Sequence, residues 1–441
     1  MASETHPGLA AAAPGAERLR VLVVDEAPPY PPDSGKRLRT WHLLRRLARQ
    51  HEVVLLCYAA GDQTAEERAQ ALAALAAAGI ECHTVPPPPE AAGWRLYARL
   101  LANCFSAWPY SVAKHHSRRF RQTMRDLHRA RGFDLLQVEW TPYASHLGAG
   151  APPYLIASHN IEAQIWRRRA EVSGHALARF YFNWQAVKME RFERRVFRRA
   201  RAVTVVSASD RAQAQGMGAA HSRIVANGVD LDDFRPAPGL VPSRLLFLGA
   251  LDWFPNQDAV IYFVDTMLPL IRARRAGVEF KIVGRRPPAT LRRRLETEPG
   301  VELVGEVADV RPWLASAAVV VVPLRVGGGS RIKIIEALAM EKAVIATTIG
   351  AEGLELRSGS HLLIADTPQQ FARLTVQLLT SPEQCAHLGQ AGGRWVRDRY
   401  SWDDSARALE AEWRRAAAGL DLHSAAGRRA GAAVAEEGEY R

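Results

Sequence analysis

Short runs of apolar and β-branched residues recur along this chain and alternate with stretches of helical spacing. In the first half they are LRVLVVDE (19–26), EVVLLCYA (52–59), DLLQVEW (134–140), YLIASHN (154–160) and AVTVVS (202–207). These runs lack the strict apolar–polar alternation of a sheet with one solvated face, which indicates parallel strands that helices cover on both faces. The first half of the chain is therefore predicted to form a doubly wound α/β domain.

The same pattern begins again after ANGVDLDDFRPAPGLVPSR (226–244), a segment rich in Asn, Gly, Asp and Pro. Five more strand candidates follow it: RLLFLGA, EFKIVGR, VELVGEV, AVVVVPL and AVIATT. A segment of this composition is typical of a linker. We therefore predict two Rossmann-like parallel-sheet domains that face each other across a cleft, with ligands at the carboxyl ends of the strands.

The predicted organisation has six parts. A helix with Trp402, Ala406, Leu409 and Trp413 at helical spacing is expected to cross back over the domain junction. The parts are a disordered tail (1–18), an N-terminal Rossmann-like domain (19–226), a linker (227–243), a C-terminal Rossmann-like domain (244–400), the crossing helix (401–418) and a second disordered tail (419–441).

Composition excludes several classes of protein. A chain of 441 residues with 48% hydrophobic and 24% charged residues suits two globular domains. Its 4 cysteines lie far apart without a CxxC or His pairing, so neither a zinc site nor a disulfide framework is indicated. No run approaches the roughly 20 apolar residues that span a bilayer. The expected location is cytoplasmic.

Arginines dominate one face of each of two predicted helices, within a chain of net charge +12. Phe120, Met124 and Leu127 take the opposite side of the first helix, and Met189, Phe192 and Val196 that of the second. The helices either pack on a core and solvate their charged faces, or form a basic surface for an anionic membrane. No nucleic-acid-binding module accompanies the charge. The arginines are Arg118, Arg121, Arg125 and Arg129 in the first helix and Arg191, Arg194, Arg195 and Arg198 in the second.

A glycine turn leads from the strand AVVVVPL into the apolar helix IKIIEALAM. Glycine permits a close backbone approach, and the first turn of a helix presents free N–H groups, so such a turn can hold a phosphate. The turn lacks the GK[ST] of a Walker A loop and does not fit the dinucleotide fingerprint. A simple tight turn is the alternative. The candidate phosphate-binding residues are Gly327, Gly328, Gly329, Ser330, Arg331 and Lys333.

The stretch from GGGSRIKIIEALAMEKAVIAT to GAEGLE resembles the donor-site signature of the retaining glycosyltransferases of family 4, which have the GT-B fold. Further matches are PPYPPDSGKRLRTWHLLRRLA, SHNIEAQIW, VTVVSASDRAQ, VANGVDLDDF, FLGALDWFPNQDAVIYF and IVGRRP. They cover residues 19 to 415 in the expected order. The resemblance implies transfer of a sugar from a nucleoside-diphosphate sugar, held mainly by the C-terminal nucleotide-sugar-binding domain (244–400), to an acceptor held by the N-terminal acceptor-binding domain (19–226).

The resemblance also implies roles for individual residues. Glu336 would accept hydrogen bonds from the ribose hydroxyls of the donor, and the GGGSR turn would bind the diphosphate or the sugar. Gly35 would let the loop after the first strand approach the diphosphate, with Lys36 beside it, and His159 would contact the donor sugar and phosphate. No metal or other cofactor is expected, because a helix terminus and arginines can stabilise the departing diphosphate. The DLDD at 230–233 is interpreted as a turn and not as a metal site.

Two departures from the family pattern bear on catalysis. The first of a pair of glutamates found in many relatives falls at Gly328, and the loop GALDWFPNQD (249–258) lacks the Arg and Lys of others. Arg331, Lys333 or Arg285 would then take over contact with the diphosphate. We assign the chain to a subgroup with the pattern GGG[ST]R[LI]K, and list His159, Arg331 and Glu336 as the catalytic candidates.

Three functions compete at this stage. The first is a glycosyltransferase that builds a bacterial surface polysaccharide or a glycolipid on a saccharide or lipid-linked acceptor, in the cytoplasm or on the inner face of the plasma membrane. The second is a GT-B relative that binds a nucleotide sugar without transferring it. The third is another Rossmann-type enzyme, such as a sugar-nucleotide epimerase or a nicotinamide oxidoreductase. Neither the nucleotide nor the sugar follows from the sequence.

Overall fold

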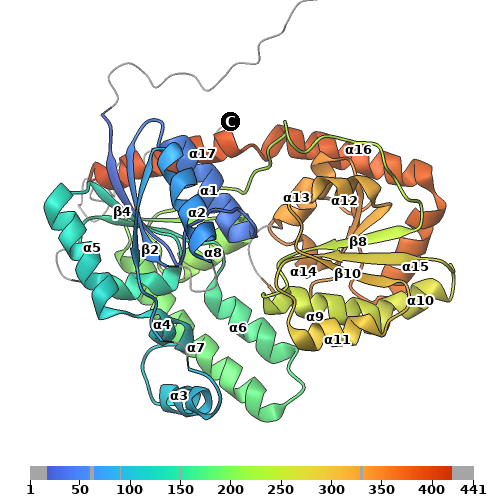
Figure 1. Ribbon diagram of the computed structural model, residues 1–441, viewed down its shortest axis with the longest axis horizontal. Coiled ribbons are helices and arrows are strands. Elements are labelled where there is room, and N and C mark those ends of the chain that lie inside the picture. Colours follow the sequence, from blue (N-terminus) through green and yellow to red (C-terminus); the bar gives the residue numbers. More distant parts are fainter. Residues whose placement is uncertain (1–16, 60–63, 90, 149–150, 328–330, 420–441) are drawn as a thin grey trace, which may run out of the picture.

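The computed structural model describes residues 17–59, 64–89, 91–148, 151–327 and 331–419. It consists of two α/β domains that lie next to each other, the N-terminal one coloured blue to green and the C-terminal one yellow to orange in Figure 1. Apart from residues 17, 18 and 419, the predicted tails lie outside the described residues. Gly328, Gly329 and Ser330 of the glycine turn also lie outside them.

The N-terminal domain contains a seven-stranded parallel sheet in the order β3-β2-β1-β4-β5-β6-β7. The order in which strands are added to the sheet changes side at β1: β2 and β3 lie on one side of it and β4 to β7 on the other. Strands β1 and β4 are parallel neighbours, with Val21 opposite Leu135. The strands are β1 (Arg20–Val24), β2 (Glu52–Tyr58), β3 (Ile80–Val85), β4 (Leu135–Val138), β5 (Tyr154–Ala157), β6 (Ala202–Val205) and β7 (Ser222–Ile224). The predictions omitted β3 and β7, which are partly exposed edge strands and therefore lack a continuous apolar run.

Helices cover both faces of this sheet (Figure 1). Two clusters of buried apolar side chains, one centred on Leu22 and Val54 and the other on Val21 and Val53, form the core on its two sides. Alternate residues of one strand point to opposite faces, which explains the division. The helices are α1 (Gly35–Leu47), α2 (Ala65–Ala77), α3 (Trp94–Cys104), α4 (Tyr110–His115), α5 (Arg118–Arg131), the 3-10 helix η1 (Thr141–His146), α6 (Glu162–Glu171), α7 (Ala176–Arg199) and α8 (Ala208–Gly216).

The C-terminal domain repeats the plan with a six-stranded parallel sheet in the order β10-β9-β8-β11-β12-β13. Its strands are β8 (Arg244–Leu248), β9 (Glu279–Val283), β10 (Val301–Gly305), β11 (Val319–Val322), β12 (Ala343–Ala346) and β13 (Leu363–Ile364). Its helices are α9 (Phe254–Tyr262), the π-helix η2 (Phe263–Met267), α10 (Leu268–Arg272), α11 (Ala289–Glu296), α12 (Arg311–Ser316), α13 (Ile332–Ala339), α14 (Thr348–Ala351), α15 (Pro368–Thr380) and α16 (Pro382–Arg399). In this sheet the strand order changes side between β8 and β11. Both domains therefore have a topological switch point, the place where parallel α/β sheets usually bind ligands.

The last helix, α17 (Trp402–Ala417), leaves the C-terminal domain and packs on the N-terminal one (Figure 1). Trp402 and Trp413 are buried in the N-terminal core, and the Trp413 indole donates a hydrogen bond to the Gln137 side chain. Gly228 passes so close to Trp402 that a Cβ would lie 2.5 Å from its backbone nitrogen. The predicted GT-B architecture, including the crossing helix, is confirmed.

The two arginine-rich helices pack on the core. Phe120 and Met124 of α5 are buried, as are Met189, Phe192 and Val196 of α7. Most of the arginines lie on the outer faces, but Arg121 is half-buried and donates to the Ser145 carbonyl at 3.0 Å. On α7 they line a shallow hollow formed by Arg191, Arg194, Arg195, Arg198 and Arg199. None of the helices in the described ranges is long and apolar enough to cross a membrane.

Candidate active site

The loop after β1 leads into α1 at the junction of the two domains. The Ser34 hydroxyl caps α1 by accepting from the Arg37 backbone N–H, at 3.4 Å. A Cβ on Gly35 would lie 3.6 Å from the Ile332 side chain of α13, an ordinary van der Waals distance. The first residues of α1 and α13 therefore meet across the cleft, and the protein itself leaves room for a small side chain at Gly35.

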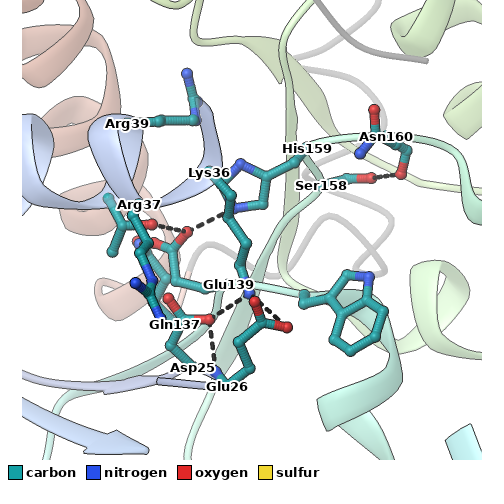
Figure 2. Close-up of polar contacts among 12 residues, drawn as sticks. Asp25, Glu26, Lys36, Arg37, Arg39, Gln137, Glu139, Ser158, His159 and Asn160 are labelled. Atoms are coloured by element: carbon teal, nitrogen blue, oxygen red, sulfur yellow. Dashed lines mark hydrogen bonds and ion pairs between the residues drawn. The ribbon is translucent and has the colours of Figure 1, made fainter. Parts of the chain in front are cut away.

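Lys36 forms ion pairs inside its own domain (Figure 2). Its ammonium lies 2.6 Å from Asp25 Oδ1 and 3.3 Å from Glu26 Oε2, at the carboxyl end of β1. Although burial lowers the pKa of Lys36, the two carboxylates outweigh it and raise the pKa overall. Lys36 therefore stays charged, and it also lies 5.4 Å from the centre of the Trp140 ring.

His159 follows β5 and pairs with a carboxylate that follows β4 (Figure 2). Its Nε2 lies 2.8 Å from Glu139 Oε2, and both side chains are at least nine-tenths buried. Burial raises the pKa of Glu139, but the His159 hydrogen bond and charge, followed by Arg39, lower it overall. Glu139 also accepts from Thr40, at 3.3 Å, and from Gln137. These bonds orient His159 at the end of its strand.

This network continues into the crossing helix. Gln137 accepts from the Trp413 indole and donates to Glu139, so a chain of hydrogen bonds runs from α17 to His159. Trp413, Gln137 and Glu139 are buried, and the His159 side chain is 9% exposed. Fully satisfied buried polar networks are rigid.

Two arginines at the cleft form ion pairs from one domain to the other. Arg285, after β9, pairs with Asp33 of the N-terminal domain at 2.7 Å and with Asp252 at 3.2 Å. Arg168 of α6 makes a two-fold contact with Glu352, at 2.5 and 2.7 Å, and donates to the Gly327 carbonyl. These bonds hold Gly327, the first residue of the glycine turn, and Glu352 against the N-terminal domain.

Gly327 begins the predicted phosphate turn with φ of 132°, a conformation that favours glycine. Arg331 ends the turn directly before α13 and is 8% exposed. Its guanidinium donates to the Ile349 carbonyl at 3.0 Å and lies 4.0 Å from Glu352. Burial lowers the pKa of Arg331 to about 10, so it remains a cation at neutral pH.

Lys333 reaches from α13 to the carboxyl end of β8. It donates to Asn256 Oδ1 at 2.8 Å and lies 4.4 Å from the centre of the Phe247 ring. Burial, followed by the charge of Arg331, lowers its pKa to about 7, against the opposing effect of Glu336. A small change in its surroundings is therefore enough to change its charge near neutral pH.

Glu336 lies one turn further along α13 and is 8% exposed. Within the described part of the chain, no hydrogen bond or ion pair reaches its carboxylate, and Lys333 binds Asn256 instead. Burial raises the pKa of Glu336 to about 8 although Lys333 opposes the rise. Lys333 lies three residues before Glu336 on the same helix, but the two side chains form no ion pair that would make this acid structural.

The predicted residues thus form two groups. Lys36 and His159 lie at strand ends of the N-terminal domain, and Arg331, Lys333 and Glu336 lie at the start of α13 in the other. Among the described residues no hydrogen bond or ion pair joins these groups directly, and Arg285 and Arg168 connect the domains. The structure shows no group of three or more His, Cys, Asp or Glu in its described ranges that could hold a metal ion. In the DLDD segment, Asp230 accepts from the Asp232 backbone N–H as part of a turn.

Four contact residues were missed from the sequence: Asp25, Glu139, Arg168 and Glu352. Asp25 and Glu139 stand directly after apolar strands, and acids at such carboxyl ends were a usable signal. Glu352 lies in GAEGLE, inside the family signature, but its partner is 184 positions away. No local pattern indicates a pairing over that distance.

Both domains match glycosyltransferase families. Residues 242–381 match the family described as "Glycosyl transferases group 1", and residues 34–229 match the "Glycosyl transferase 4-like domain". The chain belongs to the group 1, family 4-like glycosyltransferases. The predicted activity, transfer of a hexose from a nucleotide sugar, is confirmed, and the epimerase and oxidoreductase alternatives lose their basis.

Two curated glycosyltransferases illustrate the relationship. A GDP-mannose-dependent alpha-(1-6)-phosphatidylinositol monomannoside mannosyltransferase of Mycobacterium tuberculosis is 29% identical over 291 residues, which are 59% of this chain and 73% of the relative. The D-inositol 3-phosphate glycosyltransferase of Streptomyces scabiei is 26% identical over 210 residues, 42% of this chain and 46% of the relative.

Solved structures of this glycosyltransferase fold superimpose over most of the chain. Sucrose-phosphate synthase from Thermosynechococcus elongatus has a TM-score of 0.67 at 15% identity and covers 90% of this chain and 99% of its own. Anabaena HepE in complex with UDP and glucose has a TM-score of 0.63 at 13% identity, with the same coverage. At such identities the likeness concerns the fold alone.

Proposed function

We propose that the C-terminal domain of this glycosyltransferase binds a nucleoside-diphosphate sugar at the start of α13. Glu336 accepts hydrogen bonds from the ribose hydroxyls. Arg331 and Lys333, with the glycine turn, bind the diphosphate. The buried positions of these cations support this role, since charge–charge interactions are strong where water is excluded. With these groups the enzyme needs no metal ion to stabilise the leaving diphosphate.

The N-terminal domain contributes His159 to the donor sugar and its phosphate. Its hydrogen bond to Glu139 orients the ring, and Glu139 is itself held by three donors. Gly35 and Lys36 lie near the donor at the start of α1, where α1 meets α13. Lys36 acts through Asp25 and Glu26 because its ammonium is already paired with them. Arg285, held by Asp33 and Asp252, serves to join the domains more than to bind the diphosphate.

We further propose that transfer proceeds with retention and that the acceptor is a saccharide or a lipid-linked saccharide in bacterial polysaccharide or glycolipid synthesis. The curated relatives named above act on an inositol phosphate and a phosphatidylinositol mannoside, which supports an acceptor with a phosphate or a lipid. The enzyme works on the cytoplasmic side of the plasma membrane, where the arginine face of α7 attracts anionic lipids.

The observation that carries the donor assignment is the buried Glu336 carboxylate. A buried acid without a partner costs free energy, and such a group persists where function needs it. A carboxylate that accepts from two adjacent hydroxyls recovers that free energy when the ligand binds.

The test has two steps. First, differential scanning fluorimetry with UDP, GDP and other nucleotides, and with their glucose and mannose conjugates, identifies the donor by its stabilisation of the fold. Second, the transferred sugar is analysed by NMR, where an anomeric configuration equal to that of the donor supports retention. Binding of a nucleotide sugar without release of nucleoside diphosphate, with or without acceptor, would favour a protein that only binds its ligand.

A further inference from the structure

Exposed large apolar side chains gather on two helices of the N-terminal domain. Of the twelve such side chains in the described part of the chain, eight lie on α3 or α7 or directly after α3. On α3 they recur every three or four residues, as they do on α7, so each helix presents one apolar stripe to solvent. We call the two stripes together the α3–α7 face: Trp94, Tyr97, Leu101 and Phe105 of the first, and Leu177, Phe180, Trp184 and Val187 of the second.

The two stripes belong to one surface because the helices are bound to each other. The Trp184 indole donates to the Cys104 carbonyl at 3.0 Å, and Lys188 donates to the Asn103 carbonyl at 2.6 Å. In Figure 1, α3 stands apart from the sheet at the lower edge of the view, and α7 runs towards the same edge. Phe105 and Leu177 are 88% and 87% exposed, far more than a soluble core helix allows.

The chain segments that form the α3–α7 face contain cationic residues and no acidic ones. No Asp or Glu occurs from 91 to 125 or from 172 to 189, although these segments contain Arg95, Arg99 and Arg179. A hollow of about 520 Å³ lies where the helices meet. Aromatic side chains and cations line it, and no acid does: Phe105, Trp108, Trp184, Lys188, Arg191 and Arg195.

Arg191 and Arg195 make no hydrogen bond or ion pair within the part of the chain that the structure describes. Their neighbour Arg194, by contrast, pairs with Glu190 at 2.7 Å. Two exposed cations therefore stand beside an aromatic hollow and an apolar stripe. The two arginines can bind the phosphate of a phospholipid, while the apolar stripe contacts its acyl chains.

We propose that the α3–α7 face inserts into the surface of an anionic bilayer and that the hollow beside it takes a phospholipid head group. A second copy of the chain is the less suitable occupant, because a two-fold contact brings the same patch against itself and would place these arginines against each other without a carboxylate. Aromatic side chains flanked by arginine are the composition of helices that lie in the membrane interface. The inference rests on the proposed membrane attachment and extends it from the arginine face of α7 to an apolar anchor.

This position also serves the reaction. α6 connects the strand end that carries His159 with the start of α7, and its Arg168 binds Glu352 across the cleft. A lipid-linked acceptor held at the bilayer surface would therefore approach the N-terminal side of the cleft, as the proposed function requires.

The experiment is sedimentation of the full chain with phosphatidylglycerol-containing vesicles, and with pure phosphatidylcholine vesicles, at low and high salt. Wild-type protein is expected to bind the anionic vesicles. The combined substitution Phe105→Glu and Phe180→Glu should weaken this binding about tenfold or more, because apolar side chains that would enter the interface become charged. Arg191→Glu with Arg195→Glu should weaken it about tenfold at low salt and much less at high salt.

Matched controls are Leu240→Glu, an exposed apolar residue of the linker, and Arg292→Glu with Arg293→Glu, exposed cations of α11. Equal vesicle binding by the Phe105→Glu, Phe180→Glu variant and wild type would overturn the inference. So would a concentration-dependent dimer that this variant abolishes, since the face would then be a contact between copies.

Release of nucleoside diphosphate from the donor in the absence of vesicles should be the same in all these variants, because they lie outside the cleft. If wild type binds vesicles but shows no such release, the docking surface stands and the proposed transfer activity fails. If release is normal and vesicle binding is absent, the docking inference alone fails.

Discussion

The two sides of the cleft differ in how their charged groups are satisfied. On the N-terminal side, Lys36 is paired with two carboxylates and His159 with Glu139. On the C-terminal side, the Glu336 carboxylate has no hydrogen-bond partner among the described residues, and burial raises its pKa to about 8. The contrast indicates that the first side is pre-arranged by the protein, whereas the second awaits charges and hydroxyls that a ligand supplies.

The strongest effect is expected at the C-terminal side, from the cation closest to the glycine turn. Arg331→Ala should lower kcat about a hundredfold while weakening nucleotide binding much less, if this guanidinium meets charge that develops on the leaving diphosphate. Initial rates across donor concentrations separate kcat from KM, and calorimetry gives the affinity. Arg292→Ala on α11 is the control. An equal loss in kcat/KM and in affinity would show that Arg331 acts in ground-state binding.

The pre-arranged side is tested by removing the charge of Glu139 without changing its shape. Glu139→Gln should lower kcat about tenfold to a hundredfold, because the charge beside His159 is lost and one of the two oxygens that accept from His159, Thr40 and Gln137 becomes an NH2 donor. Nucleotide affinity should stay near the wild-type value, since Glu139 contacts no C-terminal residue in the described structure. Trp413→Phe should give a smaller loss of the same kind, since it removes only the donor to Gln137.

Glu52→Gln at the opposite end of the same sheet controls for the loss of a carboxylate in this domain. Unchanged turnover in Glu139→Gln, with an unchanged melting temperature, would mean that the hydrogen-bonded chain is structural only.

The side that awaits a ligand is tested by Glu336→Gln. Nucleotide affinity, measured above pH 8 where Glu336 is ionised, should fall about tenfold or more, because a charged acceptor of two ribose hydroxyls becomes a neutral amide. The melting temperature without ligand should not fall, since the buried carboxylate has no partner to lose. Calorimetry on the folded variant gives the answer, and an affinity equal to that of wild type would leave Glu336 as an incidental acid of the core.

The smallest expected effect is a dependence of donor affinity on pH, which tests the C-terminal side of the cleft further. The pKa of Lys333 is lowered to about 7, so its charge, and with it the attraction for a diphosphate, is lost as pH rises through 7. The pKa of Glu336 is raised to about 8, so its carboxylate forms as pH rises through 8 and favours the ribose contact. Donor affinity should therefore be greatest between about pH 7 and 8 and change by at most about tenfold per pH unit on either side.

Variants of Lys333 and Glu336 separate the rise of donor affinity with pH from its fall. Lys333→Met should keep only the rise of affinity with pH, and Glu336→Gln only the fall. A nucleotide sugar is the suitable ligand, because its diphosphate carries no proton that titrates in this range. A flat profile for the wild-type protein would contradict the proposed roles of both residues.

The sequence by itself determined the elements of this fold and the position of its most informative residue. Apolar runs such as VVVV at β11 are buried over their whole length, and their continuity required a parallel sheet covered on both faces. The order strand, glycine turn, helix placed Glu336 one turn into α13, because helical spacing is a local property. The missed strands β3, β7 and β13 all lie at sheet edges, whereas the edge strand β10 was predicted from its apolar run although none of its residues is fully buried.

Only the tertiary structure decided which charges are already satisfied. Lys36 was predicted to face a diphosphate, but it pairs with Asp25 and Glu26, and Arg285 pairs with Asp33 over 252 positions of the chain. The stripes of α3 and α7 have the spacing of core helices, and only the assembled domain leaves them uncovered. Partners distant in sequence and the coverage of a face depend on how whole elements pack, and local periodicity contains no information about either.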